Sequence, residues 1–160
     1  MSSTNPPVAP DARRRRSAAR LAAVQALYQQ SLVNTPPQKL MAEFHNHRFG
    51  EEIDGDRMAD ADRAFFDDVV SGVLMRMDEL DATIAQYLGQ GWTVERLDRL
   101  MLQILRAGAY ELLARTDVPL GAVVSEYADV ADAFYGRSEV GFVNALLDRL
   151  GKSVRQEQPR

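Results

Sequence analysis

Apolar residues recur every three or four positions along almost the whole of this chain, a spacing that places them on one side of an α-helix. Between residues 21 and 32, one such stripe consists of Leu21, Val24, Leu27, Tyr28 and Leu32. No segment keeps the period of two that a half-buried strand requires. The sequence of 160 residues is therefore predicted to fold as an all-α protein.

Prolines, glycines and capping residues divide the pattern into helices. Helices are expected from Ala12, from residue 38, after a cap at Asp60 or Asp62, from Asp78, after a cap at Thr93, near Pro119 and from Ser138. Gly136 and Gly151 are predicted to end the last two, and Phe134 is placed on an inner face. The acidic stretch 50–60 is predicted to be a loop. Glycines near Trp92 separate two small helical halves, at about 12–89 and 92–152.

The two ends of the chain lack this pattern. Residues 1–11 contain three prolines and are predicted to be a disordered leader, and 153–160 a flexible tail, around a folded domain at 12–152. No apolar run is long enough for a membrane span or a signal peptide. Cysteine is absent, which excludes disulfides, thiolate metal sites and a cysteine nucleophile. We expect a cytoplasmic protein.

Positive charge is concentrated near the N-terminus, although the chain as a whole has a net charge of −4. Residues 1–20 hold five arginines and one aspartate, a sum of +4, whereas residues 43–81 sum to −8 from twelve acids and four arginines. The arginines are Arg13, Arg14, Arg15, Arg16 and Arg20. Guanidinium groups bind phosphate with two hydrogen bonds and stack on bases, so this cluster favours single-stranded RNA. A solvated basic tail without a partner is the alternative.

Two further side chains are ambiguous from the sequence. Phe142 lies well away from the direction of Val140 on its helix, so it is either a partly exposed ring that stacks on a base or an ordinary core residue. Arg106 shares a helix face with Arg99, and the alternative to a role in binding is an internal salt bridge with Glu111 or Asp148.

Signs of catalysis are weak. His45 and His47 would point about 200° apart on a helix, which disfavours a metal site. The residues Asp54-Gly-Asp56 and Asp60 lack the glutamate that completes a calcium loop. No phosphate-binding glycine loop or serine–histidine pair is recognisable. We therefore expect no enzyme activity, no metal and no cofactor.

Three blocks of sequence resemble the NusB transcription-antitermination family. The first is Ala-Arg-Arg-Arg-Arg-Ser-Ala-Ala-Arg at 12–20, followed by Ala-Val-Gln-Ala-Leu-Tyr at 23–28. The second contains Leu-Asp-Arg at 97–99, Ile-Leu-Arg at 104–106, Ala-Tyr-Glu-Leu at 109–112 and Asp-Val-Pro at 117–119. The third runs from Glu126 through Phe-Tyr-Gly at 134–136 to Phe-Val-Asn at 142–144 and Leu-Leu-Asp at 146–148. The blocks keep the family's order, whereas residues 34–62 align poorly.

The resemblance implies a bacterial protein of about seven helices. It also implies binding to single-stranded boxA RNA of ribosomal RNA leaders, together with the small-subunit ribosomal protein NusE and the RNA polymerase elongation complex with other Nus factors. RNA contacts are then expected at Arg16 and Arg20, which would project from one helix face, at Phe142, and nearby at Arg106 and Asn144. Contacts with NusE are expected at Tyr28 and Met101. Ser17 stands where the family often has a basic residue, and Met101 where some members have a charged one. The alternatives are an RNA-binding module of a ribosomal RNA methyltransferase system and a helical adaptor with no RNA role.

Overall fold

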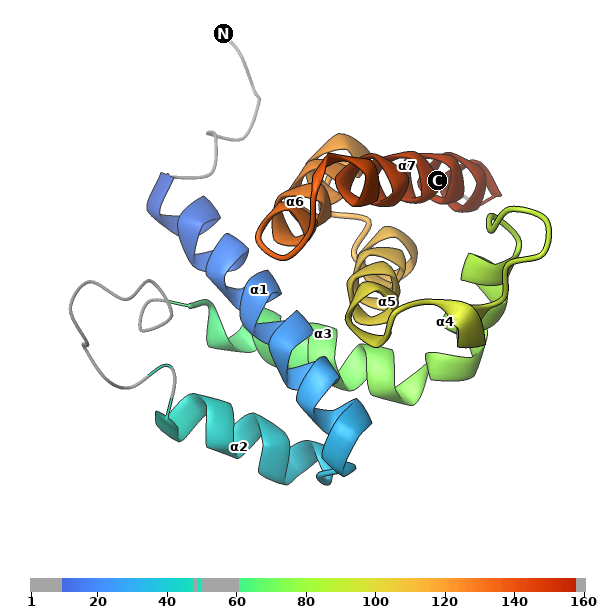
Figure 1. The fold of residues 1–160 in the computed structure, drawn as a ribbon. Coiled ribbons are helices and arrows are strands. Elements are labelled where there is room, and N and C mark those ends of the chain that lie inside the picture. Colours follow the sequence, from blue (N-terminus) through green and yellow to red (C-terminus); the bar gives the residue numbers. More distant parts are fainter. Residues whose placement is uncertain (1–9, 48, 50–60, 158–160) are drawn as a thin grey trace, which may run out of the picture.

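The computed structural model describes residues 10–47, 49 and 61–157 (Figure 1). Within these residues the chain forms seven α-helices and a short 3₁₀ helix, with no strand, so the all-α prediction is confirmed. The helices are α1 (Pro10–Val33), α2 (Pro37–His47), α3 (Arg63–Met75), α4 (Met77–Ala85), the 3₁₀ helix η2 (Val94–Arg96), α5 (Arg99–Ala114), α6 (Leu120–Asp132) and α7 (Arg137–Glu157).

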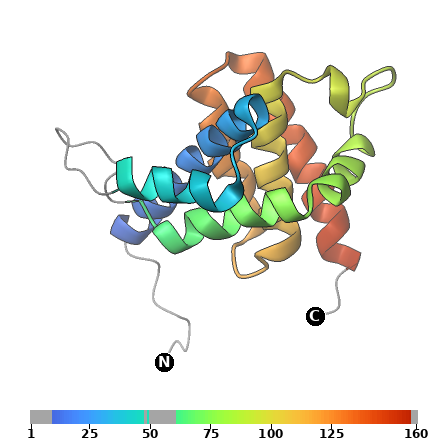
Figure 2. The ribbon, with the colours of Figure 1, turned by 90° about the horizontal axis from the view of Figure 1, so that it is seen from below.

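Helix α5 lies at the centre of the molecule and contacts α1, α3, α4, α6 and α7. In Figure 1 it is seen nearly along its axis, with α1 and α3 on one side and α6 and α7 on the other. Figure 2 shows α2 lying along the outside of α1 and α3. The two halves expected from the sequence therefore share one core around α5.

Side-chain caps set the starts of two helices. Asp62 caps α3, because its Oδ1 accepts a hydrogen bond of 3.0 Å from the Phe65 amide, as predicted. The predicted cap at Thr93 is wrong: Thr93 makes no capping bond and precedes only η2. The start of α5 is capped instead by Asp98, whose carboxylate accepts from the Met101 amide at 3.3 Å.

The outer helices are longer than predicted. Helix α1 begins at Pro10, since proline suits the first turn and Asp11 is an acid near the helix N-terminus. Helix α7 continues through Gly151 to Glu157. Gly151 serves close packing rather than termination, because a Cβ there would lie 2.9 Å from Leu112 Cδ2. Arg155 then anchors the last turns by donating to the Leu112 and Arg115 carbonyls, both at 3.1 Å.

Two side chains expected inside the protein are exposed. Leu32 is 54% exposed, and Val33 beside it at the end of α1 is exposed as well. Phe134 is 41% exposed, because α6 ends at Asp132 and the helical phase that placed Phe134 inward is lost. The acidic loop at 50–60 lies outside the described residues. None of the described helices combines the length and apolar character needed to cross a membrane.

Candidate nucleic-acid interface

The first turns of α1 present arginine side chains to solvent. Arg13, Arg14 and Arg15 are all exposed. Arg14 donates to Asp11 at 2.6 Å, a pair in which both side chains remain more than half exposed. Such surface pairs contribute little and break readily, so they do not prevent these guanidinium groups from binding a phosphate.

Arg16 is positioned by α3. Its guanidinium carbon lies 4.8 Å from the centre of the Phe65 ring, and its Nε lies 3.8 Å from Asp62 Oδ2. About a third of the side chain stays exposed. Because the stacking on Phe65 orients the guanidinium without using its donors, Arg16 remains available to an anion.

Arg20 does not project into solvent beside Arg16, and the prediction that it does is wrong. Its side chain is 4% exposed. Two of its nitrogens donate to the carboxylate of Glu111 on α5, at 2.8 and 3.0 Å, and a third donates to Glu126 on α6 at 2.7 Å. Arg20 lies one turn after Arg16 on the same face of α1. At that point α5 and α6 cover this face, so Arg20 belongs to the core.

The carboxylates around Arg20 are shared with two hydroxyl groups. Tyr127 donates to Glu111, and Ser17 donates to Glu126 at 2.5 Å. Burial works to lower the pKa of Arg20, but the hydrogen bond and the charge of Glu111 outweigh it and raise that pKa. Burial, followed by the charge of Glu111, raises the pKa of Tyr127 well above its usual value. This network keeps its arginine charged and its tyrosine neutral, and it ties α1 to α5 and α6.

Arg106 is also internal, and the alternative of a salt bridge is confirmed with a different partner. Its Nε and Nη2 donate to the two carboxylate oxygens of Asp81 on α4, each at 2.7 Å. The Arg106 side chain is about a tenth exposed. The predicted partners Glu111 and Asp148 are engaged elsewhere, with Arg20 and with Lys152 respectively.

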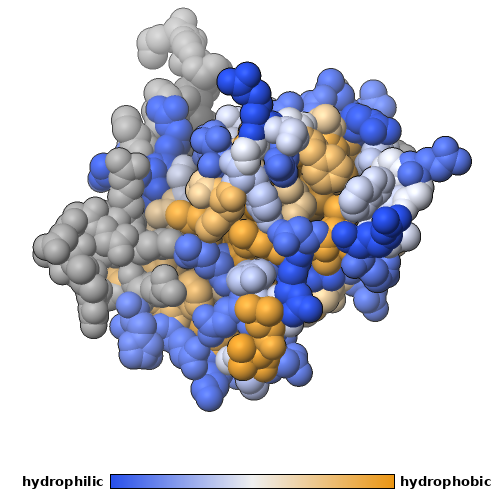
Figure 3. Space-filling model, in the orientation of Figure 1, coloured by the Kyte–Doolittle hydropathy of each residue, from blue (hydrophilic) through white to orange (hydrophobic). Residues whose placement is uncertain are grey.

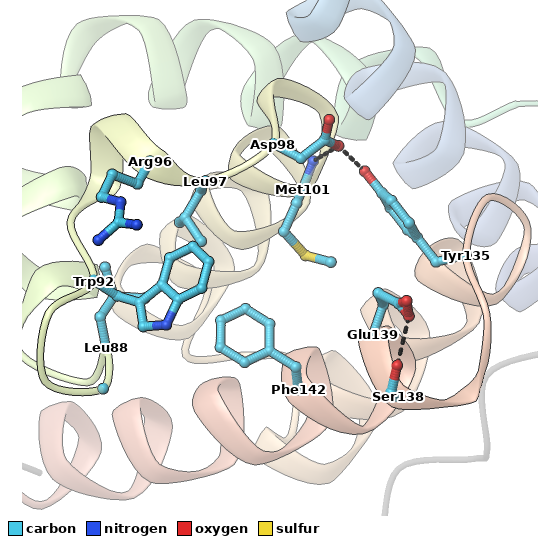
Figure 4. A pocket seen from close by; sticks show the side chains of 11 residues that line it. Leu88, Trp92, Arg96, Leu97, Asp98, Met101, Tyr135, Ser138, Glu139 and Phe142 are labelled. Atoms are coloured by element: carbon cyan, nitrogen blue, oxygen red, sulfur yellow. Dashed lines mark hydrogen bonds between the residues drawn. The ribbon is translucent and has the colours of Figure 1, made fainter.

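An apolar groove of about 550 Å³ opens at the other end of α5. Its lining includes Leu88, Trp92, Leu97, Met101, Tyr135 and Phe142 (Figure 4). Figure 3 shows apolar side chains exposed in the middle of the face seen in Figure 1, surrounded by hydrophilic ones. The groove has the size typical of small-ligand sites, which span about 300–1,000 Å³.

Phe142 lies in this groove rather than in the core. Phe142 is 36% exposed, and its ring points into the groove from the start of α7 (Figure 4). Met101 reaches the same space from the first turn of α5, although only 5% of it is exposed. The geometry thus favours the partly exposed alternative for Phe142, while its contact with a base stays a prediction.

The groove also contains Trp92 and Arg96, for which the sequence alone predicts no role in binding. Trp92 is 54% exposed, and the Arg96 guanidinium lies 5.1 Å from the centre of its ring. A single tryptophan preceded by two glycines predicts only a boundary between the two halves. The turn that brings it opposite Phe142 is a tertiary feature without a helical signature.

The end of α1 borders the groove. Tyr28 is 37% exposed on this end of α1, and Arg99 of α5 donates to the Ser31 carbonyl at 3.1 Å. Tyr135 donates to Asp98, the residue that caps α5. Burial, followed by this hydrogen bond, raises the pKa of Tyr135. Tyr28 and Met101, the two predicted partner contacts, therefore lie on neighbouring elements around the start of α5.

The predicted RNA contacts do not form one patch. Because Arg20 pairs with Glu111 near the end of α5 while Met101 and Phe142 lie near its start, α1 places its arginines about 15 Å along α5 from the groove. Asn144 is exposed, but it follows Phe142 by two residues and so points about 200° away on α7. A single ligand that contacts both the arginines of α1 and the groove must therefore be an extended molecule.

No group of three metal-binding side chains is found in the part of the chain that the structure describes. His45 Nε2 lies 2.7 Å from Asp67 Oδ1, and His47 is exposed on the end of α2. His45 is thus engaged with α3 rather than with His47. Residues 54–60, which the sequence analysis rejected as a calcium loop, lie outside the described ranges.

A sequence model of the NusB family matches residues 17–152, most of the chain. The chain belongs to the NusB family. It is 62% identical to the transcription antitermination protein NusB of Sphingopyxis alaskensis, a match covering 89% of this chain and 95% of that protein. The NusB protein of Novosphingobium aromaticivorans is 59% identical over 88% of this chain and 95% of its own length. NusB proteins are antitermination factors rather than enzymes, which agrees with the sequence prediction.

Solved NusB structures have the same fold. Thermotoga maritima NusB superposes with a TM-score of 0.67 at 26% identity, covering 86% of this chain and 90% of that one. A crystal structure of the antitermination factors NusB and NusE in complex with double-stranded RNA gives a TM-score of 0.73 at 23% identity, covering 88% and 98%. The NusB fold of seven helices, suggested by the sequence resemblance, is confirmed.

Proposed function

We propose that this NusB protein is a transcription antitermination factor that binds single-stranded boxA-type RNA of ribosomal RNA leaders jointly with the ribosomal protein NusE. It acts as an adaptor that binds the RNA and NusE together and presents them to the RNA polymerase elongation complex. The observation that carries the proposal is the family match along most of the chain, joined to an exposed arginine turn on α1.

The arginine turn supplies affinity for a polyanion. Arg13 and Arg15 are exposed, and Arg16 is oriented by Phe65 with its donors largely unused. Contacts between arginine and phosphate release counterions and carry no sequence information. We therefore assign Arg13 to Arg16 to the RNA backbone. We assign Arg20 to the fold, because its donors are already satisfied by two carboxylates.

Sequence preference must come from a different part of the surface. Phe142 is exposed in a groove that is mostly apolar, and an aromatic ring stacks on the face of an unpaired base. A base inside a duplex is stacked between its neighbours and cannot make such a contact. For this reason we propose a single-stranded ligand, although the similar NusB–NusE complex mentioned above contains double-stranded RNA.

The NusE partner is assigned to the surface around the start of α5. Tyr28 and Leu32 lie four residues apart on one face of α1, and both are exposed. They form an apolar surface of the kind that a protein partner covers, next to the edge of the groove where Met101 lies, itself only 5% exposed. A helical adaptor with no RNA role would use this surface alone and leave the arginine turn dispensable.

Binding of a short boxA-type RNA by the protein alone tests the proposal. The same sequence as a duplex and a scrambled single strand are the comparisons, each measured over a range of salt concentrations. We expect the boxA-type single strand to bind most tightly, and we expect Arg13→Ala to flatten the plot of log affinity against log salt by about 0.7. Equal affinity for all three RNAs, or no effect of Arg13→Ala, would overturn the proposal.

A further inference from the structure

Trp92 occupies an exposed position that the fold holds in place. Gly91 adopts a φ of +86°, which a residue with a side chain rarely adopts, and the Trp92 amide donates to the Gly89 carbonyl at 3.0 Å. Arg96 closes the turn, since its Nη1 donates to the Gly91 carbonyl at 2.6 Å. The indole is therefore held by an ordered turn, even though Trp92 is 54% exposed.

The indole has one face covered and one face open toward the groove. The Arg96 guanidinium lies 5.1 Å from the ring centre on one side. Figure 4 shows the ring turned toward the same space as Phe142, with Leu88 and Leu97 nearby. An exposed tryptophan opposite an exposed phenylalanine offers two flat surfaces, which suit a flat aromatic ligand.

Two acids and one arginine line the groove, so an anion would be bound by individual arginines and not by the charge of the lining as a whole. The two acids in its lining are engaged within the protein: Asp98 accepts from the Met101 amide and Tyr135, and Glu139 accepts from Ser138 at 2.8 Å.

Arginines near the groove, by contrast, have free donors. Among the described residues, neither Arg96 nor Arg149 forms an ion pair with a carboxylate. Arg149 follows Phe142 by seven residues on the same face of α7, about 10 Å along the helix, and stacks on Tyr87 at 5.6 Å. Each of the two guanidinium groups thus lies over an aromatic ring on the groove's side of the protein.

We propose that the groove binds one unpaired nucleobase of the RNA between Trp92 and Phe142, with Arg96 and Arg149 on the phosphates at its two sides. The assignment rests on the proposed function and adds Trp92, Arg96 and Arg149 to the RNA-binding surface. An aromatic pair combined with free guanidinium groups is the chemistry of single-stranded nucleic-acid sites. It explains why a tryptophan is held half-exposed by a fixed turn.

Trp92 is the only tryptophan in the chain, so its fluorescence reports directly on the groove. The probe is a single-stranded boxA-type RNA, titrated into the full-length protein without NusE. We expect the RNA to quench the fluorescence with the same midpoint as an independent binding measurement. Saturating RNA that leaves the emission unchanged would overturn the proposal.

Substitutions separate stacking from charge. Trp92→Ala should weaken RNA binding roughly 5- to 150-fold and leave the salt slope unchanged, whereas Trp92→Phe should retain most of the affinity. Arg96→Ala should reduce the salt slope by about 0.7. Phe134→Ala, which removes an exposed aromatic ring outside the groove, is the matched control and should bind as the unaltered protein does. Circular dichroism checks that each variant is folded.

The outcomes distinguish this proposal from the proposed function. If Trp92→Ala binds RNA normally while Arg13→Ala weakens binding, the groove assignment fails and the proposed function stands. If the unaltered protein binds no RNA, both fail. If NusE alone quenches Trp92, and Trp92→Ala weakens NusE but not RNA, the groove is a protein site and the assignment fails.

Discussion

Arg20 on α1 and Glu111 on α5 form a two-point ion pair inside the helical bundle, with Nε 2.8 Å from Oε2 and Nη2 3.0 Å from Oε1. Neither side chain is more than 4% exposed. Buried charges are tolerated only when paired and hydrogen-bonded, and here Tyr127 and Glu126 complete the set. The pair fixes the arginine-bearing part of α1 against the centre of the protein.

Arg20→Ala is expected to lower the free energy of unfolding by about 3–5 kcal/mol, because it leaves the Glu111 carboxylate buried without its cation. Chemical denaturation measures the change. Arg13→Ala is the matched control: Arg13 is exposed, so its loss should change stability by less than about 0.5 kcal/mol. Equal stability of the two variants would contradict the structural role of Arg20.

The sequence predicts the cluster of five arginines, but it does not predict which of them are exposed and which is buried. Helical periodicity is a local property, so the number of helices and most of their inner faces could be predicted. Whether Arg16 or Arg20 faces solvent depends on what covers α1, and the partners of Arg20 lie 91 and 106 residues away in sequence. A cluster of charged residues also predicts exposure for all of its members, so the burial of Arg20 could not be predicted from the sequence.

The groove was only partly predictable for a related reason. Phe142 and Met101 were identified through resemblance to the family, and the structure places both in one groove. Trp92 and Arg96 lie on an irregular turn between helices, where no periodic pattern indicates which way a side chain points. The resemblance to the family places Asn144 near the same surface as Phe142, but the helical rotation between the two residues points them to different faces of α7.

Gly72→Ala is expected to destabilise the protein by roughly 1–3 kcal/mol, because a Cβ at Gly72 would lie 2.2 Å from the Tyr110 ring. Gly141→Ala is the same substitution in α7, where nothing beyond the neighbouring residues and the backbone of the helix itself lies within 4 Å of the added Cβ. It should stabilise the protein by up to about 1 kcal/mol through helix propensity. Thermal unfolding of both variants checks the contrast, and a stable Gly72→Ala protein would refute this packing of α3 on α5.

Arg106→Ala is expected to lower stability by roughly 2–3 kcal/mol, since Asp81 loses both of its charged hydrogen bonds. A folded Arg106→Ala protein should bind RNA with an unchanged salt slope, because the side chain is committed to Asp81. Denaturation and RNA titration together check this expectation. A slope reduced by about 0.7 would show that Arg106 contacts a phosphate after all.

Alkaline pH should destabilise the protein. Burial, followed by the hydrogen bond to Asp68, raises the pKa of Tyr110 from 10.0 to about 12. Above pH 10 the unfolded chain loses this proton while the folded protein keeps it, so stability present at lower pH is lost as pH rises toward 12. Tyr110 should contribute a loss of about 1.4 kcal/mol per pH unit in this window. Denaturation between pH 10 and 12 should therefore show a shallower slope for Tyr110→Phe, and identical slopes would contradict the burial of this hydroxyl.

The adaptor role is tested most directly by titrating boxA-type RNA with and without the NusE ribosomal protein of the same organism. If the protein presents one composite surface, RNA should bind about 5- to 150-fold more tightly when NusE is present, the range typical of coupled sites. By reciprocity, NusE should bind more tightly by the same factor when RNA is present. RNA affinities that are equal in the two titrations would contradict the account.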